Sequence, residues 1–271
     1  MKIKTTLKTA FLAVLMSLLG FNALYAQSEP PVIRFGGGAQ IGGSIFFPGD
    51  FKEYAFDFWD DLCSQFGECA PEAKAIFLGY SYNYRGVMRF NNLIQVEGWM
   101  EKFYGSGVGI TANYYLSEYY NGSWTEQELN AEYNWSPSYK AGGLTVLLTP
   151  GAKDKSRMAF LTVGAGLGVY RGTLNYRSKG NYIVNGSQAA SWNVNQDFNG
   201  KTLGYNAVLG ITYAPVDFLE TESMFAGRWA KAPELVNDEG DIFTNPYKGN
   251  KKVSLDFSGF EIRLGIKLML P

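Results

Sequence analysis

Three observations in the sequence predict an all-β fold, an eight-stranded antiparallel up-and-down transmembrane β-barrel. Apolar residues alternate with polar or small residues along eight segments, and the connections between these segments are alternately long and short. Residues 27–271 also contain no apolar run approaching the ~20 residues of a transmembrane helix. Strands are therefore the elements with which this part of the chain would cross a membrane, and closure into a barrel would leave no unpaired edge in the hydrocarbon.

Residues 1–26 have the pattern of a secretory signal peptide. Lys2, Lys4 and Lys8 form a basic start, an apolar stretch follows, and small residues ending at Ala26 suit a cleavage site. We expect residues 27–271 to form the mature barrel domain. The full chain has a net charge of −1, and removal of the three lysines makes the rest more acidic, so the charge gives no indication of a nucleic-acid partner.

The strands are predicted from period-two alternation, in which one face is apolar and the other polar or glycine-rich. The clearest segment is the last one, where Phe260, Ile262 and Leu264 alternate with Glu261 and Arg263. The eight predicted segments are 32–47, 75–86, 92–104, 137–149, 157–177, 201–214, 218–231 and 260–270.

The lengths of the connections favour a membrane barrel over a soluble sandwich. The short connections are 87–91, 150–156 and 215–217, and each is flanked by long ones. Bacterial barrels have short periplasmic turns and long extracellular loops, whereas a Greek-key sandwich has no reason to alternate its loop lengths. With an even number of strands, both chain termini are expected on the periplasmic side. Outward-facing aromatic residues at the two rims are then expected to form interfacial girdles, with Tyr82, Tyr84 and Tyr213 near the periplasmic rim and Phe47, Tyr205 and Trp229 near the other.

The polar faces of the strands would point into a lumen that has room for side chains and little else. Five basic and five acidic residues share this face, and isolated charges there would be costly, so we expect an ion-paired network that plugs the lumen. The expected members are Arg34, Arg85, Glu97, Glu101, Glu220, Glu222, Arg228, Glu261, Arg263 and Lys267. The alternative is that these carboxylates are catalytic or line an ion path.

The glycine-rich stretch TVGAGLGVYRG could be read as a phosphate-binding loop or as a strand. A dinucleotide loop needs Gly-x-Gly-x-x-Gly between a strand and a helix, but Gly164, Gly166 and Gly168 are spaced two apart and no helical period follows. The spacing instead places all three glycines on the lumen face of one strand. There they would leave room for bulky neighbours, so Gly166→Trp should impair folding.

Two features stand out in the connection between the first two strands. Cys63 and Cys69 are expected to close a small disulfide loop, with free thiols as the alternative. Asp50, with Glu53 three residues on, could begin a helix whose apolar side would include Phe51. This helix could lie on the membrane, cover the barrel mouth, bind a partner, or simply pack on its own neighbours.

The segments VIRFGGGAQIGG, FLTVGAGLGVYRG and GFEIRLGIKLML resemble the small OmpA/OmpX-type outer-membrane β-barrel domains. The resemblance covers nearly all of residues 27–271 and rests on strand pattern, and the chain departs from it by ending in Leu270-Pro271 instead of a terminal aromatic residue. It implies an integral protein of the bacterial outer membrane with periplasmic termini.

Composition restricts the chemistry open to this chain. The sequence has no histidine, which excludes Ser-His and Asp-His mechanisms, and we expect no enzyme activity, cofactor or metal site. We expect a monomer with a structural and surface-interaction role. Its expected partners are membrane lipid or lipopolysaccharide and an extracellular or host ligand bound through loops 48–74 and 105–136. A narrow pore or a barrel binding a small ligand or lipid is the alternative.

Overall fold

The computed structural model describes residues 33–66, 77–90, 93–150 and 159–270. The chain divides into two compact units, Met1–Ile33 and Arg34–Pro271, and the second contains the sheet described below. The predicted signal peptide at 1–26 and Cys69 lie outside the described residues, so the signal peptide and the disulfide remain predictions. No helix among the described residues is both long enough and apolar enough to cross a bilayer.

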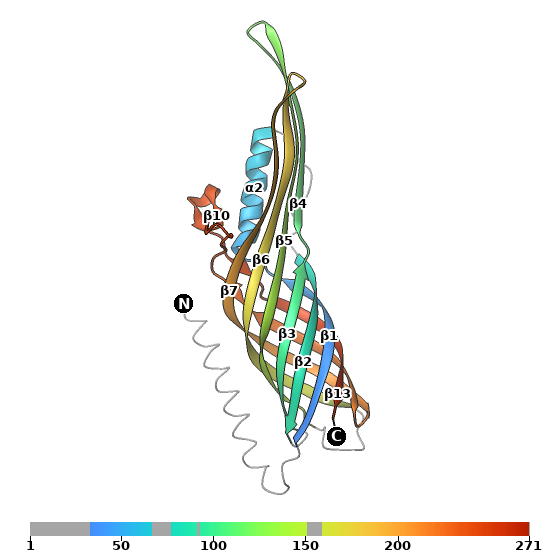
Figure 1. Cartoon of the computed structure of the whole chain (residues 1–271). Coiled ribbons are helices and arrows are strands. Elements are labelled where there is room, and N and C mark those ends of the chain that lie inside the picture. Colours follow the sequence, from blue (N-terminus) through green and yellow to red (C-terminus); the bar gives the residue numbers. More distant parts are fainter. Residues whose placement is uncertain (1–32, 67–76, 91–92, 151–158, 271) are drawn as a thin grey trace. The chain divides into compact units, whose positions relative to one another are not determined.

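Eight strands form a closed antiparallel ring, which confirms the predicted fold class (Figure 1). The ring runs β2, β1, β13, β8, β7, β6, β5, β3, and β3 also pairs with β2 to close it. The strands of the ring are β1 Ile33–Phe46, β2 Phe77–Phe90, β3 Ile94–Gly105, β5 Ser123–Leu148, β6 Ala159–Val184, β7 Ser187–Val216, β8 Leu219–Trp229 and β13 Gly259–Met269. We call the end with the short β2–β3, β5–β6 and β7–β8 connections the turn end, and the opposite end the extended end.

Alternation along each strand separates an apolar exterior from a polar interior. On β13, Ile262 and Leu264 are 62% and 55% exposed, whereas Glu261 and Arg263 are 3% and 5% exposed. This is the reverse of a water-soluble protein, in which charges face the solvent. A continuous apolar exterior of this kind is what a barrel presents to lipid.

Strands β5, β6 and β7 continue far beyond the ring, with 26, 26 and 30 residues (Figure 1). A fourth strand, β4 Val108–Tyr120, continues the line of β3 after a break and pairs with the first half of β5. Most of the segment 105–136, which the sequence pattern assigns to a loop, is therefore a β-hairpin that extends the barrel strands beyond the ring. We call the part of β4–β7 beyond the ring the extension.

Asn-Gly pairs make the two hairpin turns of the extension. Asn121 and Gly122 have φ of 52° and 86°, and Asn185 and Gly186 have φ of 50° and 74°. Positive φ at both central residues is the signature of a type I′ turn, which matches the twist of paired strands. Both faces of the strands in the extension are rich in polar residues, so the sequence pattern alone suggests loops there. The Asn-Gly turns are the local signal that these segments are hairpins.

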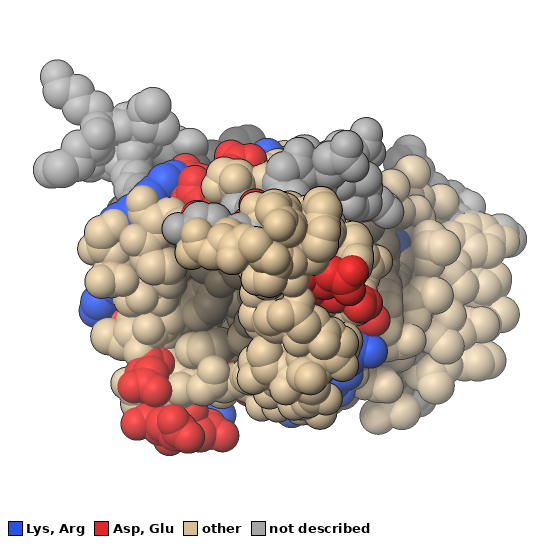
Figure 2. All heavy atoms as spheres, turned by 90° about the horizontal axis from the view of Figure 1, so that it is seen from above, with Lys and Arg blue, Asp and Glu red and all other residues tan. Residues whose placement is uncertain are grey.

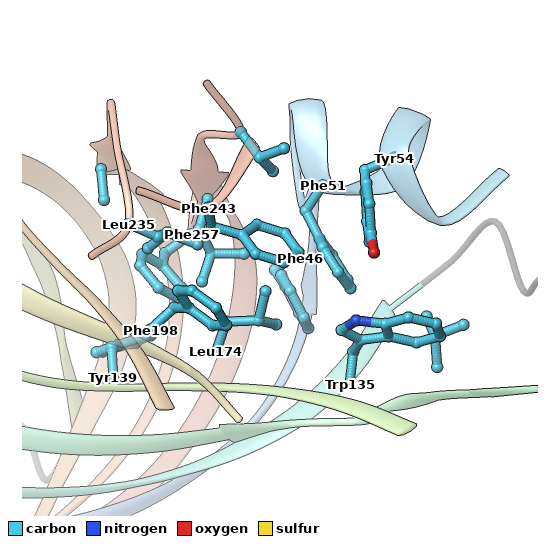
Figure 3. Packing of buried hydrophobic residues seen from close by; sticks show 14 of the residues in the cluster. Phe46, Phe51, Tyr54, Trp135, Tyr139, Leu174, Phe198, Leu235, Phe243 and Phe257 are labelled. Carbon is cyan, nitrogen blue, oxygen red and sulfur yellow. The ribbon is translucent and has the colours of Figure 1, made fainter. Parts of the chain in front are cut away.

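The helix expected in the first long connection is present as α2, Asp50–Phe66. It packs on its own neighbours: Phe51 is fully buried, and the Tyr54 ring lies 4.8 Å from Phe243 and 6.0 Å from Trp135 (Figure 3). The β8–β13 connection supplies the other side of this packing through short elements. These are β9 Lys231–Ala232, β10 Thr244–Asn245, η1 Pro246–Lys248, β11 Lys251–Lys252 and β12 Leu255–Asp256. An aromatic core therefore lies over the extended end of the ring.

Asp50 fastens the start of α2 to the β8–β13 connection. Its carboxylate accepts a hydrogen bond of 2.6 Å from Ser254 Oγ and forms ion pairs of 3.6 and 3.7 Å with Lys231 and Lys251. The hydrogen bond from Ser254, aided by the two lysines and opposed by partial burial, lowers the pKa of Asp50 below its ordinary value.

This lowered pKa predicts an acid-sensitive attachment of α2. A carboxyl group whose pKa is lower in the folded state contributes stability above its unfolded pKa of about 3.9, and this contribution is lost as the pH falls through the folded value. We expect α2 amides to exchange faster below about pH 4, after correction for the intrinsic exchange rate. Asp50→Asn should exchange faster at pH 7 and lose the added acid sensitivity. An unchanged pH profile in this variant would contradict the role given to Asp50.

Candidate functional site

The lumen at the turn end holds one network of charges, the turn-end cluster. Its members are Arg85, Arg89, Glu97, Glu220, Glu222 and Lys267. Arg85 Nη1 lies 2.9 Å from Glu97 and 3.1 Å from Glu222, and Arg89 Nη1 lies 2.5 Å from Glu220. Arg89 also donates hydrogen bonds of 3.0 and 2.6 Å to the side-chain oxygen of Gln95. Each cation therefore has a carboxylate partner supplied by a neighbouring or facing strand.

Lys267 occupies the centre of the turn-end cluster and is completely buried. Its ammonium group pairs with Glu222, lies 3.3 Å from Glu220 and 3.9 Å from Glu97, and donates a 3.4 Å hydrogen bond to Gln95. A lysine with no access to water is tolerated only when its charge is compensated in this way. β13 contributes the lysine, whereas β3 and β8 contribute the acids, so the cluster ties the far sides of the barrel together.

A second network, the upper cluster, lies on the extended-end side of the first. Arg263 Nη2 is 2.7 Å from both Glu101 and Glu261, and Arg228 Nη1 is 3.1 Å from Glu101 and 3.4 Å from Glu261. The Tyr139 hydroxyl also donates to Glu101. The guanidinium carbon of Arg228 lies 4.7 Å from the centre of the Tyr139 ring, a cation–π contact. All four charged side chains are at most 7% exposed.

One expected member of the network lies elsewhere, and one actual member was not expected. Arg34 is at the turn end, where its guanidinium donates to the backbone oxygens of Asp217 at 2.5 Å and Leu270 at 3.4 Å, away from the carboxylates. Arg89 takes its place in the turn-end cluster. The prediction ended the second strand at Gly86 and assigned Arg89 to a turn, but β2 continues to Phe90 and keeps Arg89 on the lumen face. Arg89 lies four residues after Arg85 and therefore on the same face of a strand, and this spacing was the sequence signal that could have placed it in the lumen.

Above the charges, buried aromatic rings pack on one another inside the barrel. Phe103 and Tyr139 stack with centroids 4.8 Å apart, and Tyr139 meets Phe257 edge to face at 5.1 Å. Trp99 lies over the glycine face of β6, where a β-carbon added to Gly168 would come within 2.7 Å of the indole. The glycine-rich stretch thus serves side-chain packing, as its spacing predicted.

The six aromatic residues expected at the rims all face outward, at 38–62% exposure. Two are not at the expected rim, because β2 is longer at the turn end than predicted. Tyr82 pairs with Lys102, near the extended end of β3, and Tyr84 pairs with Met100 in the middle of the strand. Phe47, Tyr205 and Trp229 lie toward the extended end, and Tyr213 lies close to the β7–β8 turn, so the two girdles remain a prediction for these four residues.

The carboxylates of the two clusters are all engaged in charge pairing. Every carboxylate of the two clusters has a cationic partner within 3.4 Å. Among the described residues, no group of three or more His, Cys, Asp or Glu side chains is placed to hold a metal ion. The acidic stretch Asn237–Asp241 is a turn in which the Asn237 side-chain oxygen accepts the backbone N–H groups of Glu239 and Asp241 at 3.1 and 2.7 Å.

Comparisons with known proteins give a distant structural likeness. No protein-family model and no curated protein matches the sequence. The Neisserial surface protein A structure is 9% identical with a TM-score of 0.39, covering 89% of this chain and 99% of that one. Ail of Yersinia pestis, solved with the heparin analogue sucrose octasulfate, is 10% identical with a TM-score of 0.35, covering 88% and 99%. A major outer membrane protein of Thermus thermophilus is 9% identical with a TM-score of 0.37, covering 87% and 99%.

At such low identities, neither residue roles nor ligands can be transferred from these proteins to this chain. The closed ring, its apolar exterior and its charged interior are established by the structure of this chain alone. In architecture, the chain is a closed eight-stranded antiparallel β-barrel with an apolar exterior and a charged interior.

Proposed function

We propose that this chain is a monomeric, non-enzymatic outer-membrane protein whose barrel is a closed anchor and whose extension is a surface-interaction module. The observation that supports this proposal is the charge pairing in the lumen, where five basic and five acidic side chains form two clusters beneath a layer of aromatic rings. These side chains are paired with partners on several strands, so clearing them from the lumen would break buried ion pairs, which is costly. A barrel filled in this way supports a role for its exterior and its ends instead of its lumen.

The extension supports the surface-interaction part of the proposal. Within it, β4 pairs only with β5 in the described registers, and residues 187–198 of β7 pair only with β6, so the sheet has two open edges. Unpaired N–H and C=O groups along such an edge can pair with an extended segment of another protein. Seen from the extended end, most of the coloured surface belongs to uncharged residues, with small groups of acidic and basic side chains between them (Figure 2).

The orientation assigned here is the extended end outside the cell and both termini in the periplasm. Short turns on the periplasmic side are the rule for bacterial barrels. Epitope tags inserted between Asn121 and Gly122 and, separately, between Asp217 and Phe218 distinguish the two ends. On intact cells an antibody should label the first tag and not the second. The opposite pattern would reverse the orientation.

The closed lumen is tested by conductance of the purified barrel in planar bilayers. We expect no steady ohmic current from the native chain. Arg228→Ala combined with Glu101→Ala removes one cation and one anion from the upper cluster and should admit some current if the variant still inserts. A steady, large conductance of the native chain would contradict the closed lumen and favour the rival function, a narrow pore. Buried atoms such as Asn83 Oδ1 and Arg85 Nε, which have no hydrogen-bond partner among the described residues, are where water would enter such a pore.

A further inference from the structure

Four cationic side chains form one row across four neighbouring strands on the outside of the barrel. The register pairs Lys102 of β3 with Lys140 of β5, Lys140 with Arg171 of β6, and Arg171 with Lys201 of β7. All four are exposed. Adjacent strands lie about 4.8 Å apart, so this cationic row spans roughly 14 Å.

The cationic row has no internal compensation among the described residues. No acidic side chain in the described part of the chain forms an ion pair with any of its four members, and Lys102 Nζ lies 4.7 Å from the centre of the Tyr104 ring. Like charges directly opposite each other on paired strands are destabilising. Further along the outer face of β5 and β6, opposite charges are placed together, because Lys179 of β6 pairs with Glu132 of β5 at 3.0 Å. An anionic partner from outside the chain would therefore relieve the repulsion within the row.

The place of the row identifies the source of that partner. One step toward the turn end, the outward residues are Met100, Gly142, Val169 and Leu203, of which Leu203 is 78% exposed. One step toward the extended end, they are Tyr104, Ser138, Thr173 and Asn199. The cationic row thus marks the boundary between the apolar exterior and the polar extension, the level at which lipid headgroups lie.

Among the described residues of β8, β13 and β1, no outward-facing cation lies at this boundary, and the exposed Lys231, two residues beyond the end of β8, is paired with Asp50. The outward residues toward the extended ends of β8, β13 and β1 are aromatic, with Tyr205 stacked on Trp229 at 5.9 Å and Phe47 edge to face with Phe260 at 6.5 Å. Nonspecific snorkelling of basic side chains would not favour one side. Four cations gathered on one side form a local site.

We propose that the cationic row binds the phosphate groups of lipid headgroups in the membrane leaflet at the extended end. This inference rests on the membrane insertion and orientation proposed above, and it adds a defined lipid class. Arginine and lysine at headgroup level each contribute about 1 kcal/mol to binding an anionic surface, which is roughly a fivefold change in affinity. Bound phosphates would also offset the repulsion between the paired cations.

The test uses the full barrel in phosphatidylcholine vesicles that contain either bisphosphorylated lipid A or the same lipid after dephosphorylation. Insertion of every variant is first verified by its heat-dependent gel mobility, so failure to insert is scored separately from failure to bind. The thermal midpoint of the native chain should rise with lipid A and not with the dephosphorylated lipid. Each cation removed by Lys102→Gln, Lys140→Gln, Arg171→Gln or Lys201→Gln should raise the lipid A fraction needed for half of this shift about fivefold.

A control variant removes four lysines from the extended-end surface, by Lys179→Gln, Lys248→Gln, Lys251→Gln and Lys252→Gln, and should keep the lipid A response. In vesicles without lipid A, the variant lacking the whole row should be at least as stable as the native chain, because repulsion is relieved. Equal destabilisation in all vesicles would overturn the proposal in favour of a structural role. Equal stabilisation of the native chain by soluble polyphosphate would overturn the lipid source.

Discussion

Glu101→Gln is expected to destabilise the barrel by about 3–5 kcal/mol, because it leaves buried guanidinium groups short of one negative charge. Glu101 is the shared partner of Arg228 and Arg263, at 3.1 and 2.7 Å, and glutamine keeps its size while removing its charge. The measurement is urea unfolding in lipid vesicles, followed by the loss of the compact form on unheated gels.

Two further variants separate charge from packing at this position. Glu132→Gln removes an acid of the exposed pair with Lys179 and should cost less than about 1 kcal/mol. Glu101→Gln combined with Arg263→Gln restores charge balance and should be more stable than the sum of the two single effects, by coupling typical of contacting residues. A cost below about 1 kcal/mol for Glu101→Gln alone would indicate a hydrated lumen and contradict the ion-paired one.

Gly166→Trp is expected to prevent the barrel from reaching its compact form. A β-carbon at Gly166 would already collide with Thr145 Oγ1 and the backbone oxygen of Leu144, and it would lie 2.6 Å from Asn206 Oδ1. Even a methyl group overpacks this face, which typically costs about 1–3 kcal/mol, and an indole needs far more room. The readout is the fraction of chain with heat-dependent mobility after refolding into vesicles.

Gly43→Trp is the matched control for this substitution. A β-carbon added to Gly43 would have no neighbouring atom within 4 Å, and this glycine lies on the outer side of β1, opposite Ile262. A tryptophan there would meet lipid and should be accepted. Efficient folding of Gly166→Trp alongside Gly43→Trp would show that the lumen is not packed against β6.

The sequence predicts the ring well because the signal for each strand is local. Alternation is read within one strand, so β1 and β13 appear close to their observed bounds, and the lumen charges follow from parity alone. The errors arise where the placement of a residue depends on the position at which a strand ends. The end of β2 at Phe90 instead of Gly86 explains both the omission of Arg89 and the misplacement of Tyr82.

The extension and the pairing partners were beyond the reach of pattern alone. Residues such as Asn130 of β5 and Asn181 of β6 make the outer face of the extension polar. Its strands therefore resemble loops in the sequence, and the Asn-Gly turns are what identify them as hairpins. Which carboxylate meets which cation depends on strand tilt and stagger around a closed ring, as does the alignment of Lys102, Lys140 and Arg171. These are properties of the closed barrel that no single segment contains.

The most direct test of the central claim, a closed barrel embedded in the membrane, is membrane fractionation followed by gels of heated and unheated samples. The structure predicts that the chain stays with the outer membrane and that the unheated form migrates as a compact species, because its closed ring of paired strands resists detergent until it is heated. A chain recovered in the soluble periplasm, with the same mobility before and after heating, would contradict the account.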